Sequence, residues 1–130
     1  MKQLAHIITA HGGIERFKGF AKPNTTPTPD EVFDRFMPDI SHAELKVLLY
    51  IIRRTFGFKK QADAISLKQI SEGIITKAGK RLDSGAAVDR RTAMRAVKHL
   101  EEIGAISIRR ARTEDGYNYV NIYSLRFREE

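Results

Sequence analysis

The stretch VDRRTAMRAVKHLEEIGAI, residues 88–106, has the pattern of one amphipathic helix that ends at a glycine. Asp89 is a favourable N-cap residue, and Gly104 suits the left-handed conformation that follows many helices. The apolar positions recur at spacings of three and four, which predicts that the core contacts Ala93, Ala96, Val97, Leu100 and Ile103. The opposite face, which we expect to lie in solvent, carries Arg91, Met94, Arg95 and Lys98, with Glu102 at the far end.

The residues after this helix predict a two-stranded antiparallel ribbon. Segments 105–112 and 117–127 are rich in β-branched and aromatic residues, and Asp115-Gly116 between them is a strong hairpin signal. The ribbon's polar side chains include Arg109, Arg110, Arg112, Tyr117 and Tyr119. We expect Tyr123 and Leu125 to pack in the core.

Three capping boxes predict the starts of three helices before residue 88. They lie at residues 28–31, 41–44 and 66–69, and the first has a proline at the first helical position. We expect these helices to end at Met37, at Gly57 and near Gly73. The second is apolar on several faces, which predicts that it is the buried centre of the domain.

The remaining segments divide the chain. Residues 1–27 end in the proline-rich KPNTTPTP and are interpreted as an N-terminal arm and linker, followed by one domain over residues 28–127. Residues 74–87 are too long for the turn of a helix-turn-helix and form an insertion, with a small hairpin turning at Ala78-Gly79.

The last three predicted helices, followed by a basic hairpin, have the order of elements found in a winged helix-turn-helix. The predicted fold class is therefore mainly α with a small β-hairpin wing. In such a fold the last helix enters the major groove of DNA, and the ribbon beside it lies along the backbone or reaches a minor groove.

The distribution of charge points to a polyanionic partner. The chain has a net charge of +7, and residues 77–112 carry ten basic and four acidic side chains, a net charge of +6 in that region alone. A concentrated positive field suits nucleic acid better than it suits solubility, for which scattered charges of both signs are enough. Double-stranded DNA is the predicted partner.

The predicted DNA contacts fall into three groups. On the helix they are Arg91, Thr92, Arg95 and Lys98; on the hairpin they are Arg109, Arg110, Arg112 and Tyr117; in the insertion they are Lys77, Lys80 and Arg81. Each group has an alternative interpretation: a solvated helical face, a charged edge strand that resists aggregation, and a solvated loop.

Other classes of function find little support in the sequence. There is no cysteine, the histidines at 6, 11, 42 and 99 do not have metal-ligand spacing, and the glycines form neither a P-loop nor a dinucleotide fingerprint. The longest apolar run, residues 47–52, is far shorter than the roughly 20 residues of a membrane span. We therefore expect a cytoplasmic protein with no enzyme activity, no cofactor, no metal and no membrane partner.

Residues 55–70, TFGFKKQADAISLKQI, resemble a stretch in the N-terminal DNA-binding domain of bacteriophage replication protein O and related phage and plasmid replication initiators. The shared features are Phe56-Gly57-Phe58, Lys60, Asp63, Ile65-Ser66 and Gln69. The upstream ELKVLLYIIRRTFG and the downstream DRRTAMRAVKHLEEIGAI look like the central and recognition helices of that domain, so the resemblance covers about residues 25–125.

The resemblance implies sequence-specific binding of repeats at a replication origin. The recognition-helix positions carry over onto Arg90, Arg91, Thr92, Arg95 and Lys98. It also implies a helicase or its loader as a partner, although the sequence ends at Glu130, before the C-terminal region that recruits them. We expect either a separated DNA-binding domain or a protein that acts alone. Two alternatives stay open: a transcriptional regulator of a mobile element, which could be a homodimer, and a winged helix that binds protein.

Overall fold

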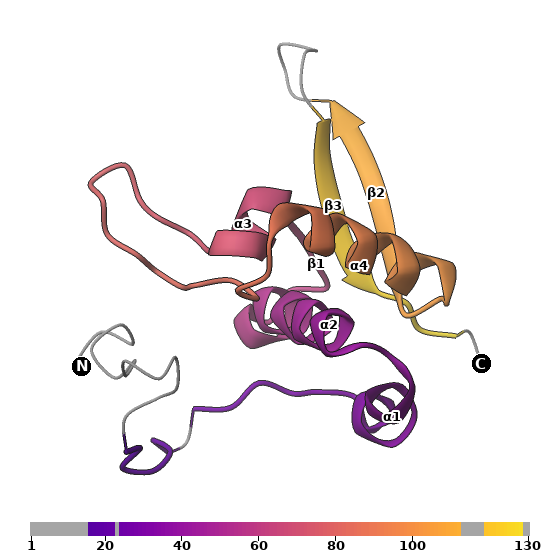
Figure 1. Ribbon diagram of the computed structural model, residues 1–130, viewed down its shortest axis with the longest axis horizontal. Helices are drawn as coiled ribbons and strands as arrows, with labels where there is room; N and C mark the ends of the chain where they lie inside the picture. The colour runs from indigo at the N-terminus through magenta and orange to yellow at the C-terminus, as the bar shows by residue number, and fades with distance from the viewer. Residues whose placement is uncertain (1–15, 23, 113–118, 129–130) are drawn as a thin grey trace.

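The computed structural model describes residues 16–22, 24–112 and 119–128 and combines helices with a small antiparallel sheet (Figure 1). The helical elements are the π-helix η2 (Val32–Phe36), α1 (Met37–Asp39), α2 (His42–Thr55), the 3-10 helix η3 (Phe56–Phe58), α3 (Leu67–Glu72) and α4 (Arg90–Glu102). The strands are β1 (Ala62–Ala64), β2 (Ile106–Arg112) and β3 (Tyr119–Leu125). This arrangement is consistent with that of a winged helix. The hairpin turn at Asp115-Gly116 and most of the predicted arm, residues 1–15, lie outside the described residues.

Helix α2 forms the centre of the domain, as predicted. Its side chains Val47, Leu48, Ile51 and Ile52 are at most 1% exposed, and α3, α4 and the sheet pack around it. The Ser41–Glu44 capping box is present in both directions: Glu44 N donates to Ser41 Oγ over 3.1 Å, and Ser41 N donates to Glu44 Oε1 over 2.8 Å. Helix α3 has the same reciprocal cap between Ser66 and Gln69. These two helix starts are therefore confirmed.

The prediction that the second helix ends at Gly57 was wrong by two residues. Helix α2 ends at Thr55, and the left-handed residue that follows is Lys59 (φ 58°), after the η3 turn, rather than Gly57. Gly57 leaves room for its neighbours: a β-carbon there would meet the mobile end of the Arg53 side chain and lie 3.2 Å from Thr26 Oγ1. Gly57 thus permits close packing and does not reverse the chain.

The first helical segment also differs from the prediction. The Thr28 hydroxyl donates to the Thr26 carbonyl, so there is no capping box; the helix begins at Asp30, and the Pro29 carbonyl accepts from Val32 N. The helix also continues through Pro38 to Asp39. Pro38 follows directly on the π-turn of η2, in which Met37 N donates to the Val32 carbonyl five residues earlier.

The sheet has three strands in the order β1-β3-β2, all antiparallel, where the sequence predicted two. The additional strand, β1, is only three residues long and pairs Asp63 with Tyr123. It was missed because a segment this short has no recognisable alternation, and its conformation is set by pairing with a strand far along the chain. Tyr123 is fully buried and Leu125 packs against the core, as predicted.

Helix α4 is the one predicted, with Asp89 as its N-cap and Gly104 in the left-handed region at φ 83°. The expected apolar face is buried at Ala93, Ala96, Val97 and Leu100. Ile103 was predicted to be buried, but it is 40% exposed because the chain turns away at Gly104 and leaves its side chain at the end of the helix.

The insertion is a small hairpin, as predicted. Ile75 and Arg81 form an isolated antiparallel bridge, and the turn is closed by Gly79 N donating to the Thr76 carbonyl over 2.8 Å. At its base the two ends of the loop touch: a β-carbon on Gly85 would lie 2.6 Å from Gly73 N, and one on Gly73 would overlap the Asp83 carbonyl. We call this closed base, residues 73 and 83–86, the stem of the insertion.

No helix within the described ranges is both long enough and apolar enough to cross a membrane.

Candidate nucleic-acid interface

Helix α4 presents three basic side chains on the side opposite its buried face. We call Arg91, Arg95 and Lys98 the basic face; all three are exposed, and none forms an ion pair or a side-chain hydrogen bond with the residues that the structure describes. Their spacings of four and three place them along one side of the helix, within about two turns. The basic face therefore offers three cations to a partner without breaking an ion pair to any described residue.

The start of α4 is fixed by its cap. Asp89 Oδ1 accepts from Thr92 N over 2.8 Å, and this hydrogen bond holds the pKa of Asp89 below its ordinary value. Thr92 is half-buried and lines a small hollow against the start of α2, together with Ser41 and Arg95. The Thr92 side chain therefore lies at the edge of the exposed surface of α4.

Arg90 lies away from the basic face. Its Nε and Nη2 atoms donate to Glu72 Oε2 at the end of α3, over 3.2 and 3.1 Å. Consecutive residues are about 100° apart around a helix, so Arg90 is turned toward α3 while Arg91 is turned toward solvent. Because both partners of this ion pair are about half exposed, Arg90 remains accessible, but part of its role is to link the two helices.

The β2–β3 hairpin stands beside α4 (Figure 1). Arg109 and Arg110 are exposed on β2, and neighbouring strand residues point to opposite faces of the sheet. Arg110 Nη1 lies 3.8 Å from Glu101 Oε2 on α4, which turns Arg110 toward the helix. Arg112 pairs with Tyr119 in the strand register. Tyr117, and the side chain of Arg112, lie outside what the structure describes.

The three basic residues of the insertion are not equivalent. Lys77 and Lys80 are exposed at the tip of the hairpin, whereas the Arg81 guanidinium donates to the backbone carbonyls of Glu72 and Asp83. Arg81 therefore also closes the loop. Figure 1 shows the insertion projecting to the side of α4 away from the β2–β3 hairpin.

Sequence reasoning missed a polar network behind this surface. Arg54 on α2 is only 8% exposed, and its guanidinium donates to Asp63 Oδ2 over 3.0 Å and to Tyr50 Oη over 2.9 Å. The Arg54–Asp63 ion pair is closest at 2.9 Å. The Arg54 guanidinium also reaches Gln69 Oε1 and the Ala64 carbonyl, both at 3.3 Å. The signal in the sequence was an arginine at a position that a continuous apolar helix should bury.

The network extends to the insertion through Tyr50 and Asp83. Tyr50 Oη donates to the Asp83 carboxylate over 3.1 Å, and Asp83 Oδ1 accepts from Gly85 N over 2.9 Å. Burial raises the pKa of Tyr50, and the Asp83 charge adds to this effect while Arg54 opposes it. Asp63 and Gln69, two residues that carry the family resemblance, thus anchor β1 and α3 to α2. Asp63 and Gln69 therefore help to position the helices behind the basic face and do not form part of the basic face itself.

A second contact joins α4 to the start of α2. His99 Nδ1 lies 2.6 Å from Glu44 Oε2, and Glu44 is also the residue that closes the α2 capping box. Desolvation alone raises the pKa of Glu44, but the hydrogen bonds from the Ser41 backbone and from His99 outweigh it and hold that pKa below its ordinary value. His99 therefore fixes the orientation of α4 from the edge of the basic face.

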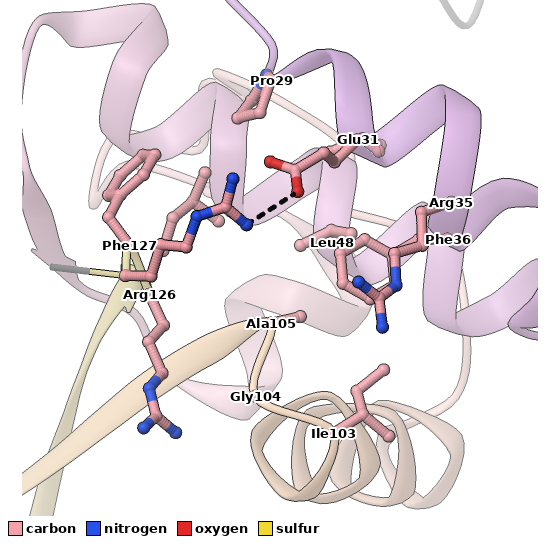
Figure 2. A pocket seen from close by; sticks show the side chains of 13 residues that line it. Pro29, Glu31, Arg35, Phe36, Leu48, Ile103, Gly104, Ala105, Arg126 and Phe127 are labelled. Atoms are coloured by element: carbon pink, nitrogen blue, oxygen red, sulfur yellow. Dashed lines mark ion pairs between the residues drawn. The ribbon is translucent and has the colours of Figure 1, made fainter. Parts of the chain in front are cut away.

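A cleft of about 710 Å³ opens at the other end of α4 (Figure 2). Its walls are the first helical segment, the turn at residues 103–105 and the chain after β3. In Figure 2 the Arg35 side chain extends toward Ile103. The Glu31–Arg128 ion pair, at 3.8 Å, links the first helical segment to the chain after β3. Phe127 stacks on Phe56 at 5.9 Å and holds the last segment in place. The cleft is at the C-terminal end of α4 and is not part of the candidate interface.

Within the described ranges, no three histidine, aspartate or glutamate side chains come together as metal ligands would. Two carboxylates close to α4 are engaged: Asp89 caps the helix, and Glu44 pairs with His99.

One of three comparisons with known proteins gave a match. Comparison with curated proteins and with solved structures gave no match. The family model described as bacteriophage replication protein O matches residues 25–122, which span every helix and strand described above except the end of β3. A match over this much of the sequence decides the classification, and the chain belongs to the bacteriophage replication protein O family.

Proposed function

We propose that this protein binds double-stranded DNA sequence-specifically and acts as the origin-binding domain of a phage-type replication initiator. In this proposal the fold is a winged helix, α4 is the recognition helix, and the β2–β3 hairpin is the wing. The observation that carries the proposal is the basic face: Arg91, Arg95 and Lys98 stand exposed and unpaired by described residues on a helix flanked by a basic hairpin. Membership of a phage replication family supports the role in replication.

The geometry suits a major groove. The groove is about 12 Å wide and admits one α-helix, and an arginine can donate two hydrogen bonds to guanine O6 and N7. Arg91 and Arg95 are the candidates for such contacts, while Lys98 suits a phosphate as a point charge. Thr92, close to the helix N-terminus, is placed for a backbone oxygen. The packed core behind α4 supports this role, because a rigid helix loses little conformational freedom on binding.

The hairpin and the insertion supply backbone contacts in this proposal. Arg109 and Arg110 extend the positive surface on one side of α4, and Lys77 and Lys80 extend it on the other. Arg112 and Tyr117 remain proposed contacts from the sequence alone. Arg90 and Arg81 contribute charge while holding α3 and the stem. Phosphate contacts of this kind fix the register of a protein on DNA without reading its sequence.

The proposal involves no chemistry by this chain. Its role is recognition in the cytoplasm of an infected cell, followed by recruitment of replication proteins such as a helicase or its loader. Binding to repeated sites would bring several copies together on one origin, with no need for a stable dimer in free solution.

The test is selection of preferred duplexes from a random pool, followed by affinity measurements over a salt series. We expect a preferred sequence arranged as direct repeats, and a log–log salt slope of several negative units because phosphate contacts release counterions. The variant Arg91→Ala/Arg95→Ala should lose the preference. A matched variant, Arg35→Ala/Arg126→Ala, removes the same charge from the cleft and should keep it. Absence of duplex binding, or binding that does not change with salt, contradicts the proposal. Selection of a single palindrome would favour a dimeric transcriptional regulator.

A further inference from the structure

Met94 is an apolar side chain on the solvent side of α4, and the packing of the domain does not account for it. It is 52% exposed, whereas the apolar residues on the opposite side of the same helix are buried. An exposed methionine contributes little to the stability of the fold, so contact with a binding partner is another role to consider for Met94. The residues around it indicate what kind of partner that is.

Those surroundings are basic on two sides. Arg91 precedes Met94 by three residues and Lys98 follows it by four, so both are its direct neighbours on the helix surface. Glu101, seven residues later, continues the ridge of Met94 and lies 3.8 Å from Arg110 of β2. Met94 is therefore on the flank of the basic face that also carries Arg90, which is turned toward α3, and Glu101, which lies near the hairpin.

The chemistry of Met94 restricts what it can contact on DNA. A thioether has no hydrogen-bond donor and only a weak acceptor, so it gains nothing from phosphate oxygens. Among the groups that base pairs present in the major groove, the C5 methyl of thymine is the apolar one. Methionine is unbranched and flexible, and it adapts its shape to such a target.

We propose that Met94 reads a thymine by packing against its C5 methyl group, so that the preferred site contains a thymine next to the base pairs contacted by Arg91. This inference rests on the proposed function and adds the identity of one base. It also gives α4 two kinds of readout: hydrogen bonding by arginine and apolar contact by methionine.

The experiment replaces each thymine of the selected site, one at a time, by deoxyuridine, which removes only the methyl group. Affinities are measured for the parent protein, for Met94→Ala and for Met37→Ala, a control at an equally exposed methionine on α1 (49% exposed). At one thymine we expect the parent and Met37→Ala to lose about fourfold in affinity, the value of one buried carbon. Met94→Ala should bind the thymine and deoxyuridine duplexes at that position equally well.

Each other outcome has a defined meaning. If Met94→Ala shows the same deoxyuridine penalty as the parent at every position, or if no thymine in the site is sensitive, Met94 does not read a methyl group and the inference is wrong. A melting temperature of Met94→Ala equal to that of the parent checks that the helix is intact. Failure of the parent to select any duplex is a different result, because it removes the proposed function itself.

Discussion

Replacing Asp63 by alanine should destabilise the domain strongly, although the residue is on a strand of only three residues. Asp63 Oδ2 accepts a hydrogen bond from Arg54 Nε over 3.0 Å, and Arg54 Nη2 lies 2.9 Å from the same oxygen as an ion-pair contact. The side chains of the pair are only 10% and 16% exposed. Without the carboxylate, the Arg54 charge keeps only Tyr50, Gln69 and a backbone carbonyl as partners.

The size of the loss follows from these contacts. Removing one partner of a buried ion pair typically costs about 3–5 kcal/mol, because the other charge stays buried and uncompensated. The partial exposure of this pair lets water replace some of the lost contact, so we expect about 2–4 kcal/mol in the free energy of unfolding. For a domain of about 100 residues this lowers Tm by about 10–20 °C.

Urea unfolding followed by circular dichroism measures this loss directly. The matched control is Lys60→Ala, which removes an exposed partner 3.4 Å from the same carboxylate and should cost no more than about 0.5 kcal/mol. The double variant Arg54→Met/Asp63→Ala should recover part of the loss, since no buried charge is then left unpaired. Equal unfolding free energies for Asp63→Ala and Lys60→Ala would show that the network does not stabilise the fold.

Three further outcomes are expected. Arg91→Ala or Arg95→Ala should weaken binding to the preferred duplex by about 1–3 kcal/mol and binding to random DNA by less, without changing the melting temperature; equal losses on both duplexes would indicate phosphate contacts instead. Arg109→Ala/Arg110→Ala should weaken all duplexes about equally in a competition assay, and a changed sequence preference would mean that the hairpin reads bases. The pKa of Glu44 is lower in the folded protein than its ordinary value of 4.5. The stability it contributes is therefore present above that value and is lost as the pH falls through the lowered one, so urea unfolding of Glu44→Gln should show a smaller loss toward acid pH than the parent.

Local signals predicted the parts of this fold that local contacts determine. The caps at Ser41, Ser66 and Asp89 form within four residues of sequence, so their patterns were sufficient. The buried and exposed sides of α4 followed from helical spacing, with Ile103 as the exception at the helix end. The basic face was therefore visible in the sequence before its exposure was known.

Features that depend on distant partners could not be predicted in this way. Strand β1 exists because β3, about sixty residues later, accepts it as a neighbour. The burial of Arg54 depends on Asp63 and Tyr50 meeting it from two directions. Likewise, no sequence pattern around Arg90 predicts its ion pair with Glu72, which lies eighteen residues away. In each case the partner becomes a neighbour only after the chain has folded.

The stem of the insertion makes the length of that loop independent of the rest of the molecule. Its ends meet at Gly73 and Gly85 and are tied to α3 by Ala86 N donating to the Ile70 carbonyl over 2.7 Å. Because the ends are already closed, doubling the number of residues beyond them adds only about 0.6 kcal/mol of loop entropy. The tip of the insertion should therefore tolerate replacement. A fluorescent tag or a longer basic segment grafted between Thr76 and Lys80 would leave the spacing of α3 and α4 unchanged.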